Sequence, residues 1–392
     1  MSLSAVLFIS PLLGPDDAWS GYRVEFAPGQ NSFEALNELC ASPLVSDFDP
    51  RHPWFFPAVI GSSVKSALGE RVVTVFPTQS GALEMEALKQ FEASQRQSRC
   101  KVGLQAAPEE KLPATGAWDY LLISASHARS LPPYTLLGLA SRSIVVATHV
   151  HSHNDREWTL NNGCSLASSE FLQTRFSRGK KADMSRLKLL EMLALLAEDA
   201  DTGSLETIFR QEPKLSYSLL RLVNSAAISP RNPIASFSQA INLLGRRQLQ
   251  RWLQLLVYAD PNNGQHPNPL LQKAAARGRK LEILASHLNP PPAAEHLQDA
   301  AFMVGTFSLL DALLNMSMKE VLEQLPLAEI IHNALAERAG ALGQLLSAID
   351  AAEIGELKLA AKIINDLGIS AEAFRDAQLI AYSWAANIRT AS

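Results

Sequence analysis

Three histidines alternate with other residues in the segment His149-Val150-His151-Ser152-His153, the most suggestive set of metal-ligating side chains in the sequence. On an extended strand, residues two apart share one face, so three imidazoles could bind Zn²⁺ or another borderline metal, with Asp155 and Glu157 as further ligands. Such neighbours lie about 7 Å apart along a strand, which makes a three-histidine site awkward. We therefore favour an exposed strand end that runs into a polar loop and keep a metal site as the alternative.

The four histidines in the last third of the chain give no sign of converging on a metal ion. His266, His287, His296 and His332 are scattered through the last third of the chain, none at helical i, i+4 spacing to another, and no His-Asp pair occurs anywhere. Metal ligands must meet within about 2.2 Å of the ion. We expect these four side chains to be surface or satisfied histidines, and we predict no metal or other cofactor.

The first 170 residues alternate short β-rich runs with segments of helical pattern, which predicts a largely parallel sheet. The expected helices cover residues 32–41, 80–96 and 130–140. The expected strands are Val6–Ile9, Tyr22–Phe26, Val72–Phe76, Lys101–Leu104, Tyr120–Ile123 and Ser143–Ala147. A full (β/α)₈ barrel usually needs about 250 residues. We therefore predict an incomplete barrel with fewer than eight strands.

From about residue 183 onward every expected element is helical. Turn and linker residues at 161–163 and 177–181 place the domain boundary between 170 and 185, so we predict an α/β domain at 1–175 and an all-α domain at 176–392. Helices are expected at about 270–288 and 296–315. Gly305 in the second of these should allow close helix contact, and Met303, Phe307 and Leu310 should form a core stripe.

Composition limits the classes of function. Residues 1–170 carry 12 Lys/Arg and 17 Asp/Glu, and the rest carries 23 and 22, so neither half has the basic excess of a nucleic-acid-binding protein. The apolar runs are broken well short of 18 residues, which argues against a membrane span. Three cysteines without C-x-x-C spacing, Cys40, Cys100 and Cys164, indicate a reducing, cytoplasmic setting.

The segment 205–258 carries three successive amphipathic helices and a continuous signature. Its parts are Glu212-Pro213-Lys214-Leu215-Ser216, Leu219-Leu220-Arg221, Asn224-Ser225-Ala226-Ala227, Ile234-Ala235-Ser236, Gln239-Ala240-Ile241, Leu244-Gly245-Arg246 and Leu249-Gln250-Arg251-Trp252. These residues resemble the signature of the HDOD family. HDOD domains look like the all-helical HD and HD-GYP phosphohydrolases, but the His-Asp doublet of those enzymes is missing here. The resemblance implies an interaction or signalling module.

Four residues of this signature, Asn224, Ser225, Gly245 and Trp252, are expected to be structural. Asn224 lies near a helix end, where its amide can satisfy backbone groups of the loop that contains Pro230 and Pro233. Trp252 should pack on the inward face of its helix. Arg246, Arg247 and Arg251 cluster at one helix start and are candidates for a surface that faces a partner, with a solvated face as the alternative.

Between Gly21-Tyr22 and residue 170 the order of elements, with Phe26, is similar to the N-terminal half of EAL-HDOD proteins. Segments 301–311 and 323–327 also resemble that family. An EAL phosphodiesterase hydrolyses cyclic di-GMP with two divalent metals held by carboxylates and an Asn. The residues at its ligand positions are different here: Arg23; Pro77-Thr78; Gln105-Ala106-Ala107; Ile123-Ser124-Ala125; and Val146-Ala147-Thr148-His149. The triplet Glu34-Ala35-Leu36 lies in a helical pattern and carries no catalytic weight.

We therefore predict that the protein is not an enzyme and does not hydrolyse cyclic di-GMP. The expected function is non-catalytic signal transduction through protein–protein interactions of an HDOD domain and a degenerate, truncated EAL-like domain. The alternative is a sensor that binds cyclic di-GMP or a related nucleotide without cleaving it. The expected partners are signalling proteins, with cyclic di-GMP and a second copy of the chain as further candidates and with neither nucleic acid nor membrane.

Overall fold

The computed structural model describes residues 5–61, 68–78, 82–108, 112, 118–132, 134–175, 248, 250–256, 258, 268–292, 296–323, 325 and 327–388. The chain forms two compact units. The first, the barrel unit, comprises Met1–Thr174, Ala352–Ala361 and Phe374–Leu379, and the second, the helical unit, comprises Arg175–Ala351, Lys362–Ala373 and Ile380–Ser392. Two C-terminal segments thus belong to the barrel unit. The functional domain limits 1–175 and 176–392 stay a prediction.

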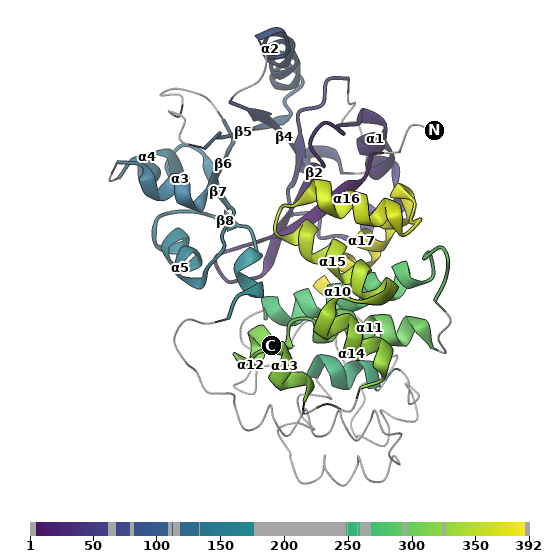
Figure 1. Ribbon diagram of the computed structural model, residues 1–392. Coiled ribbons are helices and arrows are strands. Elements are labelled where there is room, and N and C mark those ends of the chain that lie inside the picture. The colour runs from purple at the N-terminus through teal and green to yellow at the C-terminus, as the bar shows by residue number, and fades with distance from the viewer. Residues whose placement is uncertain are drawn as a thin grey trace, which may run out of the picture. The chain divides into compact units, whose positions relative to one another are not determined.

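Eight strands close into one barrel in sequence order (Figure 1). They are β1 (Leu7–Leu13), β2 (Trp19–Phe26), β3 (Trp54–Pro57), β4 (Val72–Pro77), β5 (Lys101–Gln105), β6 (Tyr120–Ser124), β7 (Ile144–Thr148) and β8 (Leu166–Ala167). The strands from β2 to β8 pair in parallel. β1 is antiparallel to both of its neighbours, and its register with β8 is the single pair Leu13↔Ala167.

The prediction of fewer than eight strands is wrong. It assumed a regular helix and loops after every strand, whereas a short turn joins β1 to β2 directly and β8 has only 2 residues. The helices α3 (Ala125–Ser130) and α4 (Thr135–Ala140) have 6 residues each. Because this turn, this strand and these helices are short, the barrel closes well within the usual length of about 250 residues.

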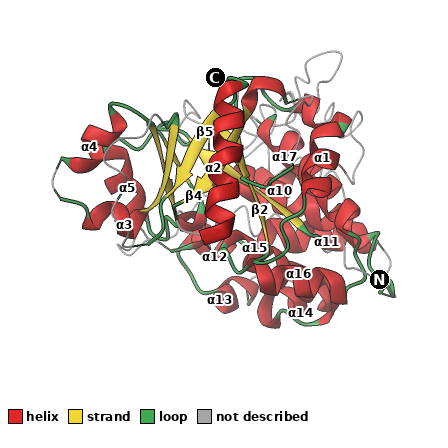
Figure 2. Ribbon diagram, turned by 90° about the horizontal axis from the view of Figure 1, so that it is seen from above, coloured by secondary structure: helices red, strands yellow, loops and turns green. Residues whose placement is uncertain are grey.

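The other helices of this part of the chain are α1 (Phe33–Ala41), α2 (Ala82–Gln97) and α5 (His153–Asn161), with single 3-10 turns at Pro43–Asp47 (η1), Gly69–Arg71 (η2) and Glu170–Gln173 (η3). Serine hydroxyls cap α1, α3 and α5, because Ser32, Ser124 and Ser152 accept from the backbone amide three residues on. The triplet Glu34-Ala35-Leu36 lies in α1, as predicted. Figure 2 shows α2 across the strands β4 and β5, with which it is in contact.

The barrel interior is filled by apolar side chains from alternating strand positions, as in other closed barrels. The residues of this core are Leu12, Phe55, Val73, Val75, Tyr120, Leu122, Val146 and Leu166. Phe55 and Tyr120 meet edge to face with ring centroids 5.0 Å apart. A packed interior of this kind leaves the mouth of the barrel as the place for a ligand.

The C-terminal helix α17 (Ala371–Ala386) supplies the partners that β8 is too short to give β1. The Gln378 side chain accepts a hydrogen bond from the Ile9 backbone amide at 2.8 Å and donates one to the Leu7 carbonyl at 2.9 Å. Buried backbone groups need such partners. The amide of Gln378 therefore replaces one strand pair.

The helical unit contains α10 (Pro269–Ala285), α11 (Leu297–Phe307), α12 (Leu310–Leu314), α13 (Met318–Leu322), α14 (Glu329–Glu337) and most of α15 (Gly340–Glu353); α16 (Leu357–Asp366) and α17 are shared between the two units. α10 and α11 cross closely at two glycines, because a Cβ on Gly305 would lie 2.7 Å from the Cα of Gly278. The predicted close contact at Gly305 is confirmed. Phe307 and Leu310 are fully buried and Met303 is half-buried.

The stretch Leu297–Leu314 is long and apolar enough to resemble a membrane span, and it alone passes that test among the residues that the structure describes. It consists of α11 and α12 with a break between them, and 67% of it is buried inside the fold. A core helix pair of a globular unit has this composition.

Candidate functional site

A pocket of about 260 Å³ opens at the carboxyl ends of strands β2 to β6. This is the end of a barrel at which strand-end residues and loops form binding sites. Its floor is the top of the barrel core at Phe55, Val75 and Leu122. The other lining residues are Arg23, Val24, Glu25, Phe26, Asn31, Pro57, Ala58, Pro77, Glu84, Leu88 and Gln105.

Arg23 is the central polar residue of this pocket. Its guanidinium lies 2.7 Å from the Glu25 carboxylate on the same strand and donates to the Gln105 side chain on β5 at 3.3 Å. Arg23 and Glu25 share one face of β2 because they are two residues apart. Their side chains remain partly exposed, at 17% and 30%. A ligand that enters the pocket therefore meets a cation held by a carboxylate and an amide.

Two acidic side chains of the pocket were missed by the sequence analysis. Glu25 lies two residues beyond the position compared with the family motif, and Glu84 is an exposed residue on α2. The alternation of Arg23 and Glu25 with buried Tyr22, Val24 and Phe26 could have indicated a polar inner face on β2. Nothing in the sequence indicated that α2 contributes to the pocket.

Of the residues compared with family ligands, the structure brings Arg23 and Gln105 together and places Pro77 in the same pocket. Five of the others serve local structure. Ala106 and Ala125 are buried, the Ala107 amide donates to the Thr78 hydroxyl at 2.9 Å, and Ser124 caps α3.

The histidine segment is not an extended strand. β7 ends at Thr148, His149 has a φ of +54°, and α5 begins at His153. His149 and His151 are only partly covered, with ring centroids 6.0 Å apart, whereas His153 lies edge-on to Phe171 at 5.3 Å. Burial lowers the pKa of His153. The prediction of a shared strand face is therefore wrong, because the chain turns at His149.

The described part of the chain does not fit a resident metal centre. No three His, Cys, Asp or Glu side chains in it lie close enough to share an ion. In the pocket, the carboxylate of Glu25 already pairs with Arg23, and Glu84 is the other acidic lining residue. Sites for two divalent cations take several carboxylates with free oxygen atoms.

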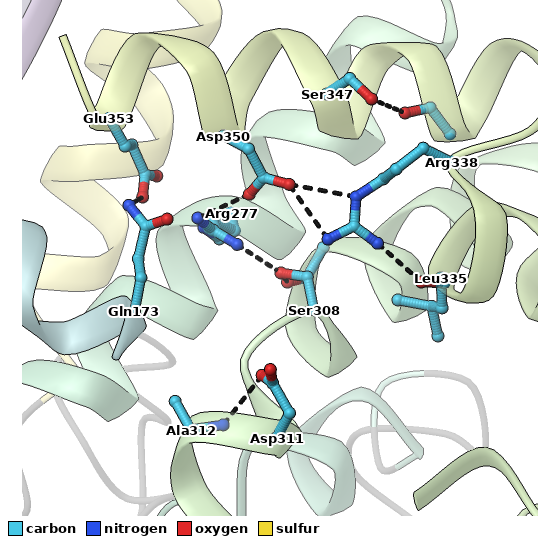
Figure 3. Close-up of polar contacts among 12 residues, drawn as sticks. Gln173, Arg277, Ser308, Asp311, Ala312, Leu335, Arg338, Ser347, Asp350 and Glu353 are labelled. Carbon is cyan, nitrogen blue, oxygen red and sulfur yellow. Dashed lines mark hydrogen bonds and ion pairs between the residues drawn. The ribbon is translucent and has the colours of Figure 1, made fainter. Parts of the chain in front are cut away.

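The helical unit has a polar cluster of its own (Figure 3). Arg277 is 1% exposed; it donates to the Ser308 hydroxyl at 2.8 Å, and its guanidinium lies 2.9 Å from the Asp350 carboxylate, which also pairs with Arg338 at 3.1 Å. Burial raises the pKa of Asp311, although its hydrogen bond from Ala312 and the nearby arginines act in the opposite direction. These contacts join α10, α14 and α15 and account for the buried arginine.

Of the seven residues singled out in the HDOD segment, Arg251 and Trp252 lie in the described part of the helical unit. Trp252 is 4% exposed and its ring centroid lies 5.6 Å from that of Trp384, so it is a core residue. Arg251 pairs with Glu282 and, at 2.7 Å, with Asp299. These contacts support a structural role for Arg251, and its partner-facing role stays a prediction. Asn224, Ser225, Gly245, Arg246 and Arg247 lie outside the described residues.

Comparison with known proteins supports part of the sequence analysis. The HDOD domain model matches residues 186–289, so the chain contains an HDOD domain, and the described part of that range is almost entirely helical. The chain is 33% identical over 190 residues to the cyclic di-GMP phosphodiesterase CdgJ of Vibrio cholerae, a match that covers 48% of this chain and 43% of the relative. It is 25% identical over 278 residues to the YuxH protein of Bacillus subtilis, a match that covers 70% of this chain and 65% of the relative.

The chain thus spans less than two thirds of the length of either curated relative. The solved structure of the Bacillus subtilis YkuI protein, which has an EAL domain and was determined with cyclic di-GMP and calcium, matches 64% of this chain and 72% of that one at 14% identity. At a TM-score of 0.32 this match does not establish a shared fold.

The prediction that the chain is not an enzyme is contradicted, because the relative from Vibrio cholerae is named a cyclic di-GMP phosphodiesterase. That prediction compared individual strand ends with a family pattern. A pocket is formed in three dimensions, and here Glu25 and Glu84 line it from positions that the comparison did not consider.

Proposed function

We propose that the protein acts in cyclic di-GMP signalling, with the pocket at the mouth of the barrel as the nucleotide site and the HDOD domain as the part that contacts signalling proteins. The observation that carries this proposal is the guanidinium of Arg23 on the wall of a partly apolar pocket. In this proposal the barrel is an EAL-like domain with an altered set of pocket residues. The name of the relative from Vibrio cholerae supports the choice of nucleotide.

The pocket offers each kind of contact that a cyclic dinucleotide requires. A guanidinium binds a phosphodiester through two parallel hydrogen bonds. The ring of Pro57 gives an apolar wall for a purine, and the amides of Asn31 and Gln105 can pair with its edge. At about 260 Å³ the pocket is at the lower limit for small-molecule sites, so it holds part of the nucleotide and the rest lies at the mouth.

Glu25 opposes binding in this arrangement, because a phosphate must compete with its carboxylate for Arg23. Substitutions of Arg23 and of Glu25 should therefore change the affinity for cyclic di-GMP in opposite directions. Arg23→Gln removes the cation, whereas Glu25→Gln frees it and removes a like charge.

Calorimetric titration of the full chain with cyclic di-GMP tests the proposal. Loss of a charge-assisted contact of about 1.5–3 kcal/mol predicts a Kd about 10- to 100-fold higher for Arg23→Gln, and a lower Kd for Glu25→Gln. Arg51→Gln is the matched control, because Arg51 also pairs with a carboxylate, that of Asp49, but is 81% exposed and outside the pocket. Binding that is absent in the parent, or equal in all variants, would contradict the proposal.

Hydrolysis of the bound nucleotide is a second candidate function, favoured by the name of the relative from Vibrio cholerae. The assay is chromatographic detection of the linear dinucleotide after incubation with Mg²⁺ or Mn²⁺. Product that forms with the parent and not with Arg23→Gln would establish turnover at this pocket. Nucleotide that is bound and recovered intact would leave binding as the function.

The HDOD domain at residues 186–289 is the part of the chain proposed to bind signalling proteins. We place its partners among signalling proteins in the cytoplasm, with Arg246 and Arg247 as candidate contacts and a homodimer as one assembly to test. Charge reversal at Arg247 should weaken the binding of a partner without lowering the melting temperature of the protein. Pull-down experiments measure the first effect and thermal melts the second.

A further inference from the structure

His149 has an unusual backbone for its position. It directly follows β7, at the carboxyl end of a barrel strand, and its φ of +54° lies in the left-handed region that few residues other than glycine adopt. Such strain persists where the surrounding structure or a function requires it. The mouth of a barrel is also where strand-end residues act on ligands.

The side chain of His149 lies among the charged groups of the mouth. Its Nδ1 is 3.2 Å from the Thr148 hydroxyl, and its Nε2 has no hydrogen-bond partner within the described ranges. Partial burial lowers the pKa of His149, and the neighbouring Arg23 lowers it further. The groups that act on it are Arg23 and Glu25 from β2, Glu170 from η3, and His151.

Arg23 therefore connects the pocket with His149. It lines the pocket, and it acts electrostatically on His149, which is not a lining residue. A cyclic dinucleotide carries two phosphodiesters on opposite sides of one ring, and the pocket has room for only part of it. A phosphate outside the pocket must find its own partner at the mouth.

We propose that His149 is a second phosphate-binding residue at the barrel mouth, which takes the phosphodiester of the bound nucleotide that Arg23 does not hold. This inference rests on the proposed function. The imidazole of His149 lies within electrostatic reach of Arg23 and Glu25 at the mouth, and Nε2 is the atom that donates to the phosphate oxygen.

The consequence is an affinity that increases as pH falls. A nearby phosphate favours the protonated imidazole, so the pKa of His149 is higher in the complex than in the free protein. Affinity should rise as pH falls through the pKa of His149 in the complex and level off below its lowered pKa in the free protein. A phosphate at hydrogen-bond distance from the imidazolium should in this way tighten binding about 10-fold.

The test measures the Kd of the full chain for cyclic di-GMP from pH 8 to pH 5.5 by calorimetry. We expect the parent to bind about 10-fold more tightly at the low end, and the Kd of His149→Gln to stay constant over the same pH range. His153→Gln is the matched control, because His153 belongs to the same segment but contacts Thr174 and Phe171. It should keep the full pH dependence.

The outcomes separate the two proposals. If the parent binds no cyclic di-GMP at any pH, the proposed function fails. If the parent binds and Arg23→Gln weakens binding, but the parent shows no pH dependence or His149→Gln retains it, the nucleotide site stands and the role of His149 is refuted. Circular dichroism of each variant at both ends of the pH range confirms that it is folded.

Discussion

Replacing Arg156 by Met should destabilise the barrel unit strongly. Arg156 lies on α5 and is 5% exposed. Its Nε and Nη2 donate to the Asp17 carboxylate at 3.0 and 2.7 Å, and Nη2 also donates to the Gly14 carbonyl. These bonds hold the turn between β1 and β2 next to the short pairing of β1 with β8.

The magnitude follows from what the substitution leaves behind. The Gly14 carbonyl keeps its hydrogen bond from the Asp17 backbone amide at 3.1 Å but loses the buried, charge-assisted one from Arg156, which costs about 1–3 kcal/mol. The Asp17 side chain is 41% exposed and can return to water, so its lost ion pair adds only about 1 kcal/mol. A loss of about 2–4 kcal/mol corresponds to roughly 4–16 °C in melting temperature for a unit of this size.

Thermal melts followed by circular dichroism compare Arg156→Met with Arg51→Met. Arg51 makes an equally close pair with Asp49, at 2.6 Å, but is 81% exposed, so its loss should leave the melting temperature unchanged. Equal melting temperatures for the parent and Arg156→Met would refute the assigned role of the buried pair. Equal losses in the two variants would show that burial does not decide the effect.

Two further substitutions test the helical unit. Trp252→Ala should cost about 3–5 kcal/mol, because it removes a buried ring packed on Trp384, and a variant that unfolds in urea like the parent would contradict this core position. Asp311→Asn should raise stability at pH 7, since burial raises the pKa of Asp311 above its ordinary value in the folded state and so penalises its charged form at neutral pH. That gain should shrink as pH falls through the raised pKa, and a gain independent of pH in urea titrations would count against the assignment.

Local sequence determined most of the elements. Apolar β-rich runs predicted β4 to β7 within one or two residues at each end, because each runs through the sheet as a buried strand. The predicted helix at 32–41 is α1, which Ser32 caps. The HDOD domain was equally evident, since a signature of consecutive residues survives in the sequence whatever the fold around it.

Closure of the barrel was decided by tertiary structure. β3 has 4 residues and β8 has 2, so neither shows a period that the sequence could reveal. Each exists because neighbouring strands supply its hydrogen bonds. The edge of β1 depends in the same way on Gln378, which lies 369 residues away from Ile9 in the sequence.

The candidate site was likewise only half determined by sequence. The residue types were readable: Arg23 and Gln105 stood out as replacements, and the three histidines stood out as a cluster. The arrangement of these residues could not be read from the sequence. The hydrogen bond between Arg23 and Gln105 joins positions 82 residues apart, and the turn at His149 separates the imidazoles that a strand would have aligned. Spacing along the chain predicts which residues share an element, whereas a pocket depends on where the closed barrel brings different elements together.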